Sequence, residues 1–253
     1  MGTERLVVVL LMAVNGLAWW SMERRAHARE RTADHVGPNL ALTALLLVVN
    51  TVFDRVAAAS GFGAPAQGLL AWWSPPAWAS VLVTIVALDG TTYLAHVLMH
   101  KLAPAWRFHR VHHSDPHVDV TTAFRQHPFE TVWRFGFLLA AAQALGASSR
   151  AVMVYLAWSA LNAQLEHAHV TWPPWLDRTL RAVIATPAMH RVHHSRVPRE
   201  TDSNYSNIFS LWDRVFGTYR PPRGGETIAT GLDDCDAPAR QRTPGLLTLP
   251  FRG

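Results

Sequence analysis

Apolar residues gather in five stretches that polar segments separate. They run from Leu6 to Met22, from Val36 to Phe53, from Ala77 to Leu88 and on past Asp89 to Leu98, from Phe135 to Ser149, and from Ala151 to Leu165. A membrane-spanning helix needs roughly 20 mostly apolar residues, and several stretches are shorter than that. The pattern predicts an all-α, multi-pass bundle of about four to five membrane helices.

Charge placement orients these helices. The segment "ERRAHARER" (Glu23 to Arg31) lies between the first two stretches, and the loop from Val56 to Pro76 is poor in charge. Basic loops stay in the cytoplasm, so the third stretch should return to that side near His96, and the polar segments that follow should form a cytoplasmic helical cap. The membrane would be a cell inner membrane or that of the endoplasmic reticulum. The first stretch could instead be a signal peptide cleaved near Gly16 to Ala18, but this would leave the arginine-rich segment outside.

Composition agrees with a lipid-facing protein. Charged residues make up 16% of the chain, and there are eleven tryptophans, against about 25% charged residues in an ordinary soluble domain. The net charge of +5 would suit nucleic acid, but the basic residues are explained by membrane orientation, so no nucleic-acid partner is expected. The single cysteine, Cys235, excludes an internal disulfide and a thiolate-rich metal site.

Histidines carry the candidate chemistry, and twelve of the fourteen lie between His96 and His194. His96 and His100 have the i, i+4 spacing that places two imidazoles on one helix face. The hexapeptide "HRVHHS" occurs twice, from His109 to Ser114 and from His190 to Ser195. Each copy places three imidazoles at i, i+3 and i+4.

Local signals predict a short helix around each copy. Pro104 suits a first turn and Asp115-Pro116 ends the first helix, while Thr186 as N-cap and Pro187 at the first position begin the second. Three exposed imidazoles would repel one another once protonated, whereas a metal stabilises neutral imidazoles. The interpretation favoured is therefore metal binding rather than a solvated helix face.

The histidines outnumber the four to six ligands that one ion takes, so two ions are expected. His167 ends the fifth stretch and is a further candidate. An anion must offset the metal charge. A bridging hydroxide or oxide is one option, and Asp89, Glu166 and Asp213 are candidate carboxylates outside the ligand set. His117, His127 and His169 have ambiguous roles, and His27 and His35 fit solvated charge. The proposed ligands are His96, His100, His109, His112, His113, His167, His190, His193 and His194.

These motifs resemble the fatty acid hydroxylase and sterol desaturase superfamily of membrane di-iron enzymes. The resemblance runs through "DGTTYLAHVLMH", "WRFHRVHHSDPHVDVTTAFRQHPFE", "QLEHAHV" and "TPAMHRVHHSRVPRETDSNYSNIFSLWDRVFGTY", from Asp89 to Tyr219. It implies that the nine histidines hold two ferrous ions, with zinc as a possible substitute. His169 stands where many members have Asn. The closing motif, which looks like a brace for the last histidine box, comprises Asp202, Asn204, Tyr205, Trp212 and Asp213.

With this resemblance the chain divides into three predicted segments. Residues 1–76 form N-terminal membrane helices and a linker, residues 77–220 form a fatty acid hydroxylase-like catalytic domain, and residues 221–253 form an irregular C-terminal tail. The tail mixes proline, glycine and charge, although Gly245 to Phe251 is apolar enough to dock back on the protein.

The implied activity is hydroxylation, or secondarily desaturation, of a C–H bond in a lipid such as a fatty acyl chain, sterol or carotenoid, using O2. Dinucleotide and iron–sulfur motifs are lacking, since "GFGAPA" has no third glycine and there is one cysteine. Electrons should come from a ferredoxin, cytochrome or reductase that docks near Arg107, Arg110, Arg191 and Arg196. A zinc-dependent membrane hydrolase of a lipid ester or phosphate and a non-enzymatic membrane metal-binding protein stay open as alternatives.

Overall fold

The fold was analysed in a computed structural model, which describes residues 3–26, 33–59, 68–223 and 228–252. Within these ranges the regular elements are all helices, and β pairing is confined to isolated bridges at Ile184–Phe209 and Ser195–Thr230. The all-α prediction is confirmed for this part of the chain. His27 lies outside the described residues.

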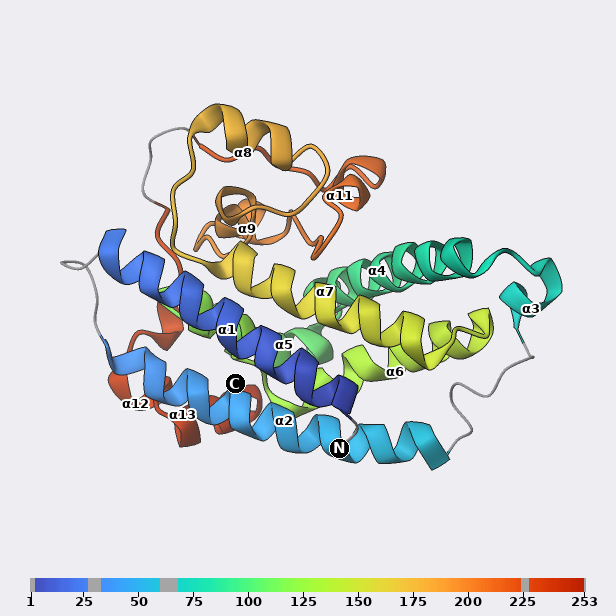
Figure 1. Ribbon diagram of the computed structural model, residues 1–253. Coiled ribbons are helices and arrows are strands. Elements are labelled where there is room, and N and C mark those ends of the chain that lie inside the picture. Colours follow the sequence, from blue (N-terminus) through green and yellow to red (C-terminus); the bar gives the residue numbers. More distant parts are fainter. Residues whose placement is uncertain (1–2, 27–32, 60–67, 224–227, 253) are drawn as a thin grey trace.

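Three helices are long and apolar enough to cross a membrane: α1 (Thr3–Ala26), α2 (Val36–Ala59) and α4 (Ala77–Lys101). The fourth and fifth apolar stretches fold as α6 (Pro128–Leu145) and α7 (Ser149–His167), which complete the bundle in Figure 1. Among the described residues, α6 and α7 do not reach the length and apolarity that mark a candidate membrane span. The larger count of four to five, and the cytoplasmic orientation, stay predictions.

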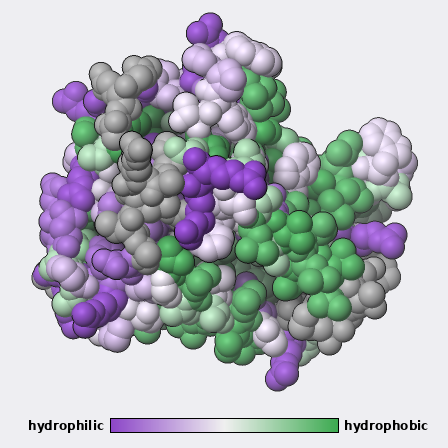
Figure 2. Space-filling model, turned by 60° about the vertical axis from the view of Figure 1, so that its left-hand side comes forward, coloured by the Kyte–Doolittle hydropathy of each residue, from purple (hydrophilic) through white to green (hydrophobic). Residues whose placement is uncertain are grey.

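The outer faces of the long helices α1 and α2 expose large apolar side chains. Val14 and Leu17 of α1 are 66% and 60% exposed, and Val48 of α2 is 61% exposed. In Figure 2 apolar side chains gather over the right-hand part of the visible face, while hydrophilic ones concentrate at its left. Exposed apolar surface of this extent marks a lipid or protein contact, and the length of α1 and α2 favours lipid.

A core between α4, α6 and α7 fixes the bundle behind the polar region. It contains Leu88, Tyr155 and Ile208, all with 0% exposure, and Ile208 comes from the loop beyond the last histidine box. Helix α6 ends at Gly146, whose φ of 68° lies in the left-handed region that glycine adopts most easily. Ser148 then caps α7 by accepting from the Ala151 N–H at 3.2 Å. The tight turn reverses the chain, so that α6 and α7 both pack on α4.

Short helices complete the structure. The apolar α3 (Leu69–Trp73) lies at the far end of the bundle in Figure 1 and contacts α6. The polar layer includes α5 (Ala103–His113), α8 (Pro174–Leu180), α9 (Pro187–His193), α10 (Pro198–Thr201) and α11 (Leu211–Val215), with 3-10 turns η1 (Ala33–His35) and η2 (Val120–Phe124). The helices α8, α9 and α11 lie together above α4 and α7 in Figure 1. Both "HRVHHS" copies sit on short helices, and Thr186 caps α9 by accepting from the Met189 N–H at 3.4 Å.

The C-terminal segment departs from the irregular tail that the sequence predicts. It contains η3 (Asp233–Cys235), α12 (Pro238–Gln241), α13 (Thr243–Thr248) and η4 (Leu249–Phe251). Leu246 and Leu249 are buried against Leu42 of α2 and Val111 of α5. The apolar run from Gly245 therefore docks on the protein, and its burial outweighs the helix-breaking prolines that suggested a loop.

Candidate metal centre

The nine histidines singled out from the sequence fall into two clusters. In each, one ring nitrogen per residue lies within 4.8 Å of the others. Cluster one comprises His96, His100, His109, His113 and His193. Cluster two comprises His112, His167, His190 and His194. The clusters adjoin, because the rings of His113 and His194 stack with centroids 4.6 Å apart.

Each "HRVHHS" copy is divided between the two clusters. The first copy gives its i, i+4 pair, His109 and His113, to cluster one and its middle residue, His112, to cluster two. The second copy does the reverse, giving His190 and His194 to cluster two and His193 to cluster one. Each of the two helices that carry the hexapeptide, α5 and α9, therefore contributes two imidazoles to one cluster and one imidazole to the other. We call this arrangement a reciprocal exchange.

The Nε2 atoms converge within each cluster. His109 Nε2 lies 3.0 Å from His96 Nε2 and 3.2 Å from His113 Nε2. In cluster two, the Nε2 atoms of His112, His167, His190 and His194 follow one another in that order at 3.1 to 3.2 Å. Two ligands that share an ion at bonds of about 2.1 Å lie within about 4.2 Å of each other, so this spacing fits a metal between the rings.

The opposite ring nitrogens are held by backbone carbonyl oxygens. The Nδ1 atoms of His96, His193 and His167 each lie 2.7 Å from the carbonyl oxygens of Tyr205, Ser203 and Ala163. An Nδ1–H that donates to a carbonyl leaves the lone pair on Nε2, which faces the cluster. This outer hydrogen bonding is how proteins orient imidazole ligands.

Burial keeps these imidazoles neutral. His109, His113 and His193 are at most 1% exposed. Burial first, and repulsion from neighbouring imidazoles second, holds the pKa of each well below its usual value. The solvated, positively charged helix face considered from the sequence is therefore wrong, and neutral nitrogen donors of this kind suit iron and zinc alike.

Asp89 and Asp213 do not join the clusters, although the sequence marked both as candidate carboxylates beside the metal. Asp89 accepts from the N–H groups of Ile208 and Phe209 and from Trp212 Nε1, at 2.9 to 3.2 Å. Hydrogen bonds to a carboxylate are stronger than those between neutral groups, so the three that Asp89 accepts hold the segment beyond the last histidine box in place. It therefore lies behind the site as a support.

Asp213 holds the same loop one step nearer the histidines. It accepts from the N–H groups of Tyr205 and Ser206 at 2.8 and 3.0 Å and from the Thr218 hydroxyl at 2.6 Å. Asn204, at a φ of 54°, bonds the carbonyls of Met189 and Arg220 through its side-chain amide. The closing motif thus positions the carbonyls that orient His96 and His193.

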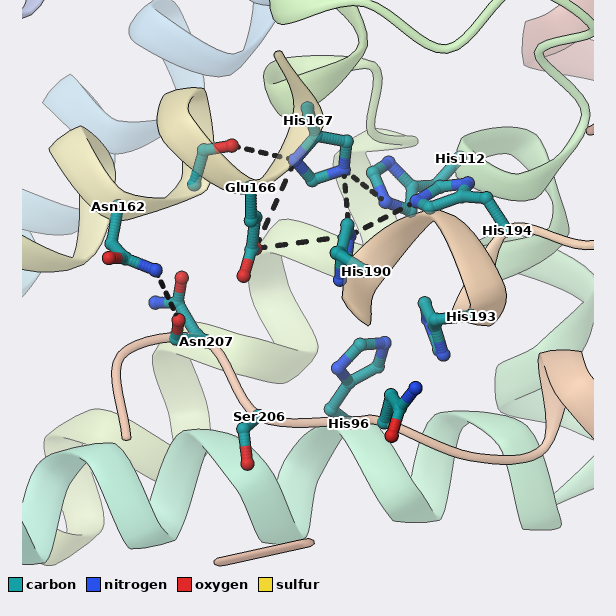
Figure 3. Close-up of polar contacts among 12 residues, drawn as sticks. His96, His112, Asn162, Glu166, His167, His190, His193, His194, Ser206 and Asn207 are labelled. Atoms are coloured by element: carbon teal, nitrogen blue, oxygen red, sulfur yellow. Dashed lines mark hydrogen bonds and ion pairs between the residues drawn. The ribbon is translucent and has the colours of Figure 1, made fainter. Parts of the chain in front are cut away.

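Three buried or half-buried carboxylates do approach the histidines. Glu166 Oε1 lies 3.9 Å from both His167 Nδ1 and His190 Nε2, and it is drawn between them in Figure 3. Glu130 Oε1 lies 3.0 Å from His109 Nδ1. Asp202 Oδ1 lies 3.4 Å from His100 Nδ1, and the hydrogen bonds from His100 and Lys101 hold the pKa of Asp202 below its ordinary value.

Glu130 was missed from the sequence. It follows His127-Pro128 in the first turn of α6, where an acidic residue also suits the helix dipole. That local explanation gives no reason to expect the contact with His109, which lies 21 positions earlier in the numbering. The distance becomes short because α5 and α6 pack together.

The ambiguous histidines lie apart from the clusters. His127 caps α6 by accepting from the Phe129 N–H at 3.1 Å. His117 contacts the ring of His35 at 5.6 Å, and the His169 N–H donates to Glu23 Oε1 at 2.6 Å. Of the three, His127 thus has a side-chain contact that supports the fold, and the contact of His169 with Glu23 is made by its backbone. His35 is 5% exposed and lies 3.2 Å from Asp119 Oδ2, so its expected solvated role is wrong.

Three of the four arginines expected to receive an electron donor are engaged within the protein. Arg110 bonds Asp234, and Arg196 bonds Asp233 and Asp236 in the C-terminal segment. Arg191 donates to the Val118 carbonyl at 3.2 Å. Arg107 stays exposed. The acidic run near Cys235 thus neutralises much of the expected basic surface.

A small apolar pocket reaches Glu130. Its volume is about 110 Å³, and its lining comprises Met99, Pro104, Ala105, Phe108, Phe129, Glu130 and Trp133. Phe129 is 58% exposed at the pocket. The pocket therefore leads from the exposed apolar face to a carboxylate that touches His109 of cluster one.

Comparison with known proteins agrees with this geometry. The fatty acid hydroxylase family model matches residues 81–218. Alkylglycerol monooxygenase of Xenopus tropicalis is 30% identical over 168 residues, which cover 64% of this chain and 34% of that protein. Ornithine lipid hydroxylase OlsE of Rhizobium tropici is 33% identical over 157 residues, 60% of this chain and 45% of that protein.

A third relative, the alternative squalene epoxidase of Phaeodactylum tricornutum, is 29% identical over 149 residues, 57% of this chain and 41% of that protein. The chain thus spans about a third to less than half of the length of these relatives. No solved structure matches. The family match contains all nine clustered histidines and covers more than half of the chain, so this protein belongs to the fatty acid hydroxylase family.

Proposed function

We propose that this protein is a membrane-bound lipid oxygenase whose two histidine clusters each hold one iron ion. The observation that carries the proposal is the burial of nine convergent imidazoles in two adjoining groups. Iron bound in this way supplies the activation of O2 and the attack on an unactivated C–H bond of the lipid. Zinc would fit the same donors, so the choice of iron rests on the family.

The chain's own residues hold and orient the donors. Carbonyl oxygens of Tyr205 and Ser203 fix the His96 and His193 rings. Carboxylates of Glu130 and Asp202 face the outer nitrogens of His109 and His100 and make those imidazoles stronger donors. Burial keeps water from the site, which protects a reactive oxidant.

The apolar pocket beside Glu130 supports a lipid substrate. Its lining is almost entirely apolar, and one of the lining residues, Phe129, is 58% exposed. An alkyl chain in the bilayer could enter there and approach cluster one without crossing water. The relatives are named for an alkylglycerol, an ornithine lipid and squalene, and long apolar chains are the feature those molecules share.

Hydroxylation is the reaction proposed first and desaturation second. Both need two electrons per turnover from outside the chain, and a ferredoxin, cytochrome or reductase is proposed as the donor. Arg110 and Arg196 are paired with C-terminal aspartates. We therefore propose that the electron donor docks near Arg107 alone, and not over the larger surface expected from the sequence.

The test uses the full chain purified in lipid nanodiscs. We expect about two iron ions per chain, and conversion of a long-chain lipid that requires a reductant and takes one ¹⁸O atom from ¹⁸O2. Product formation that is indifferent to oxygen, with ¹⁸O entering from water, would identify a metal hydrolase instead. Metal content without any turnover across a lipid panel would favour a non-enzymatic metal-binding protein.

His193→Ala tests the ligand assignment directly. His193 is fully buried in cluster one, so the variant should insert in the membrane and lose metal from that cluster. Phe129→Leu, which changes the pocket wall alone, is the matched control and should keep both ions. Wild-type metal content in His193→Ala would contradict the assignment.

A further inference from the structure

The two clusters hold unequal numbers of histidines, five and four. The "HRVHHS" copies do not cause this difference, since each cluster receives a pair from one copy and a single residue from the other. The difference comes from the long helices: α4 adds His96 and His100 to cluster one, whereas α7 adds only His167 to cluster two. Cluster two therefore has one histidine fewer, and a further donor would bring it to the same number as cluster one.

Glu166 of α7 lies beside cluster two, close to two of its four imidazoles. It is 5% exposed, its Oε1 atom lies 3.9 Å from His190 Nε2, and its Oε2 atom has no hydrogen-bond partner among the described residues. The 3.9 Å separation is within the limit of about 4.2 Å for two ligands on one ion. Figure 3 shows the carboxylate beside His167 and His190, and the last torsion of a glutamate turns easily.

Charge favours the same conclusion. A buried carboxylate without a partner is costly, and four neutral imidazoles would leave the charge of a divalent ion uncompensated. At cluster one the carboxylates of Glu130 and Asp202 lie behind the imidazoles, against their Nδ1 atoms. At cluster two Glu166 Oε1 lies 3.9 Å from the outer Nδ1 of His167 and also 3.9 Å from Nε2 of His190, the nitrogen that faces the other rings of the cluster. Glu166 is thus the carboxylate that reaches an inner nitrogen as well as an outer one.

We propose that Glu166 is the fifth ligand of the ion in cluster two, bound directly through a carboxylate oxygen. The two ions then have equal coordination numbers but different donors, five nitrogens at cluster one and four nitrogens with one oxygen at cluster two. This inference rests on the proposed two-metal function. It assigns Glu166 a role distinct from that of Glu130, which orients His109 from outside.

The test compares wild type with Glu166→Ala, Glu166→Gln and the control Glu130→Gln, each loaded with Co²⁺ in nanodiscs. Metal content is measured against increasing chelator, and the visible absorption of Co²⁺ reports coordination number, because four-coordinate Co²⁺ absorbs more strongly than five-coordinate Co²⁺. We expect Glu166→Ala to release one of its two ions at 10- to 100-fold lower chelator and to show stronger absorption. Glu166→Gln should fall between it and wild type.

Glu130→Gln should keep wild-type absorption, because it removes no ligand. Two ions with wild-type affinity and absorption in Glu166→Ala would overturn the Glu166 proposal and leave the two-metal function intact. An equal rise in absorption for Glu130→Gln would overturn it too, since the effect would then be general electrostatics. Wild type that binds fewer than two ions would instead overturn the two-metal function, and this proposal with it.

Discussion

Asp213→Asn is expected to damage cluster one from a distance. Asp213 is fully buried and accepts two backbone N–H groups and one hydroxyl, from Tyr205, Ser206 and Thr218. An amide retains one acceptor oxygen but turns an NH2 group toward one of those donors. The change loses one charge-assisted hydrogen bond and leaves a buried N–H unsatisfied, which together cost about 2–4 kcal/mol.

The position of the loop makes this loss specific. Tyr205 and Ser203 supply the carbonyls that orient His96 and His193 of cluster one, whereas His167 of cluster two is held by Ala163 within α7. A loosened loop should therefore weaken metal binding at cluster one and spare cluster two. The melting temperature should fall by about 4–16 °C, at about 2–4 °C per kcal/mol for a chain of this size.

The assay combines thermal unfolding of the metal-free protein with chelator competition on the loaded protein. Arg150→Gln is the control, because Arg150 is exposed in the first turn of α7, at the opposite end of that helix from His167, and substitutions at such positions change stability by at most about 0.5 kcal/mol. An unchanged melting temperature in Asp213→Asn would refute the loop argument. Equal loss of both ions would show that the loop supports the whole site and not cluster one alone.

Three further outcomes follow from burial and packing. Metal-free protein should lose stability as the pH falls below about 6.5, because burial lowers the pKa of His109, His113 and His193 in the folded state and the unfolded chain then binds more protons. Each imidazole lowers the free energy of unfolding by about 1.4 kcal/mol per pH unit. Melting temperatures that stay equal at pH 7.5 and 5.5 would contradict this. Ala105→Phe should fill the 110 Å³ pocket and lower kcat/KM at least about tenfold with both ions retained, whereas unchanged kinetics would place lipid entry elsewhere. Leu246→Ala, at a residue with 0% exposure, should cost about 2–5 kcal/mol in thermal unfolding, and a neutral result would mean that the C-terminal segment adds little to the fold.

The sequence contained enough to predict the donors but not their division. Spacing of i, i+3 and i+4 shows that imidazoles share a helix face. The eight histidines chosen on that basis do meet, together with His167, which was chosen because it ends the fifth apolar stretch. Nothing in a helical repeat says that His112 leaves His109 and His113 for the other cluster, because that depends on how α5 and α9 cross. The supporting contacts were hidden for the same reason. Glu130 reaches His109 only through the packing of α6 on α5.

The C-terminal segment shows the opposite failure. Its prolines and glycines correctly indicate broken structure, since α12 and α13 have only 4 and 6 residues. Composition cannot report, however, that Leu246 and Leu249 meet a complementary face of α2 and α5. Burial of each leucine stabilises the folded state by about 1.5–3 kcal/mol. This gain is larger than the free energy by which the local sequence favours a loop.

The same segment connects the fold to the site. Its aspartates bond Arg110 and Arg196, and each of these arginines lies within or directly beside one copy of "HRVHHS". Gln241 also donates to the Ser114 carbonyl at 2.8 Å and accepts from Arg125, whose guanidinium bonds Ser114 Oγ at 2.8 Å. The reciprocal exchange of imidazoles needs α5 and α9 at a fixed spacing, and contacts made to both copies from one segment provide it. The C-terminal helices therefore brace the metal centre, although they contribute no residue to either cluster.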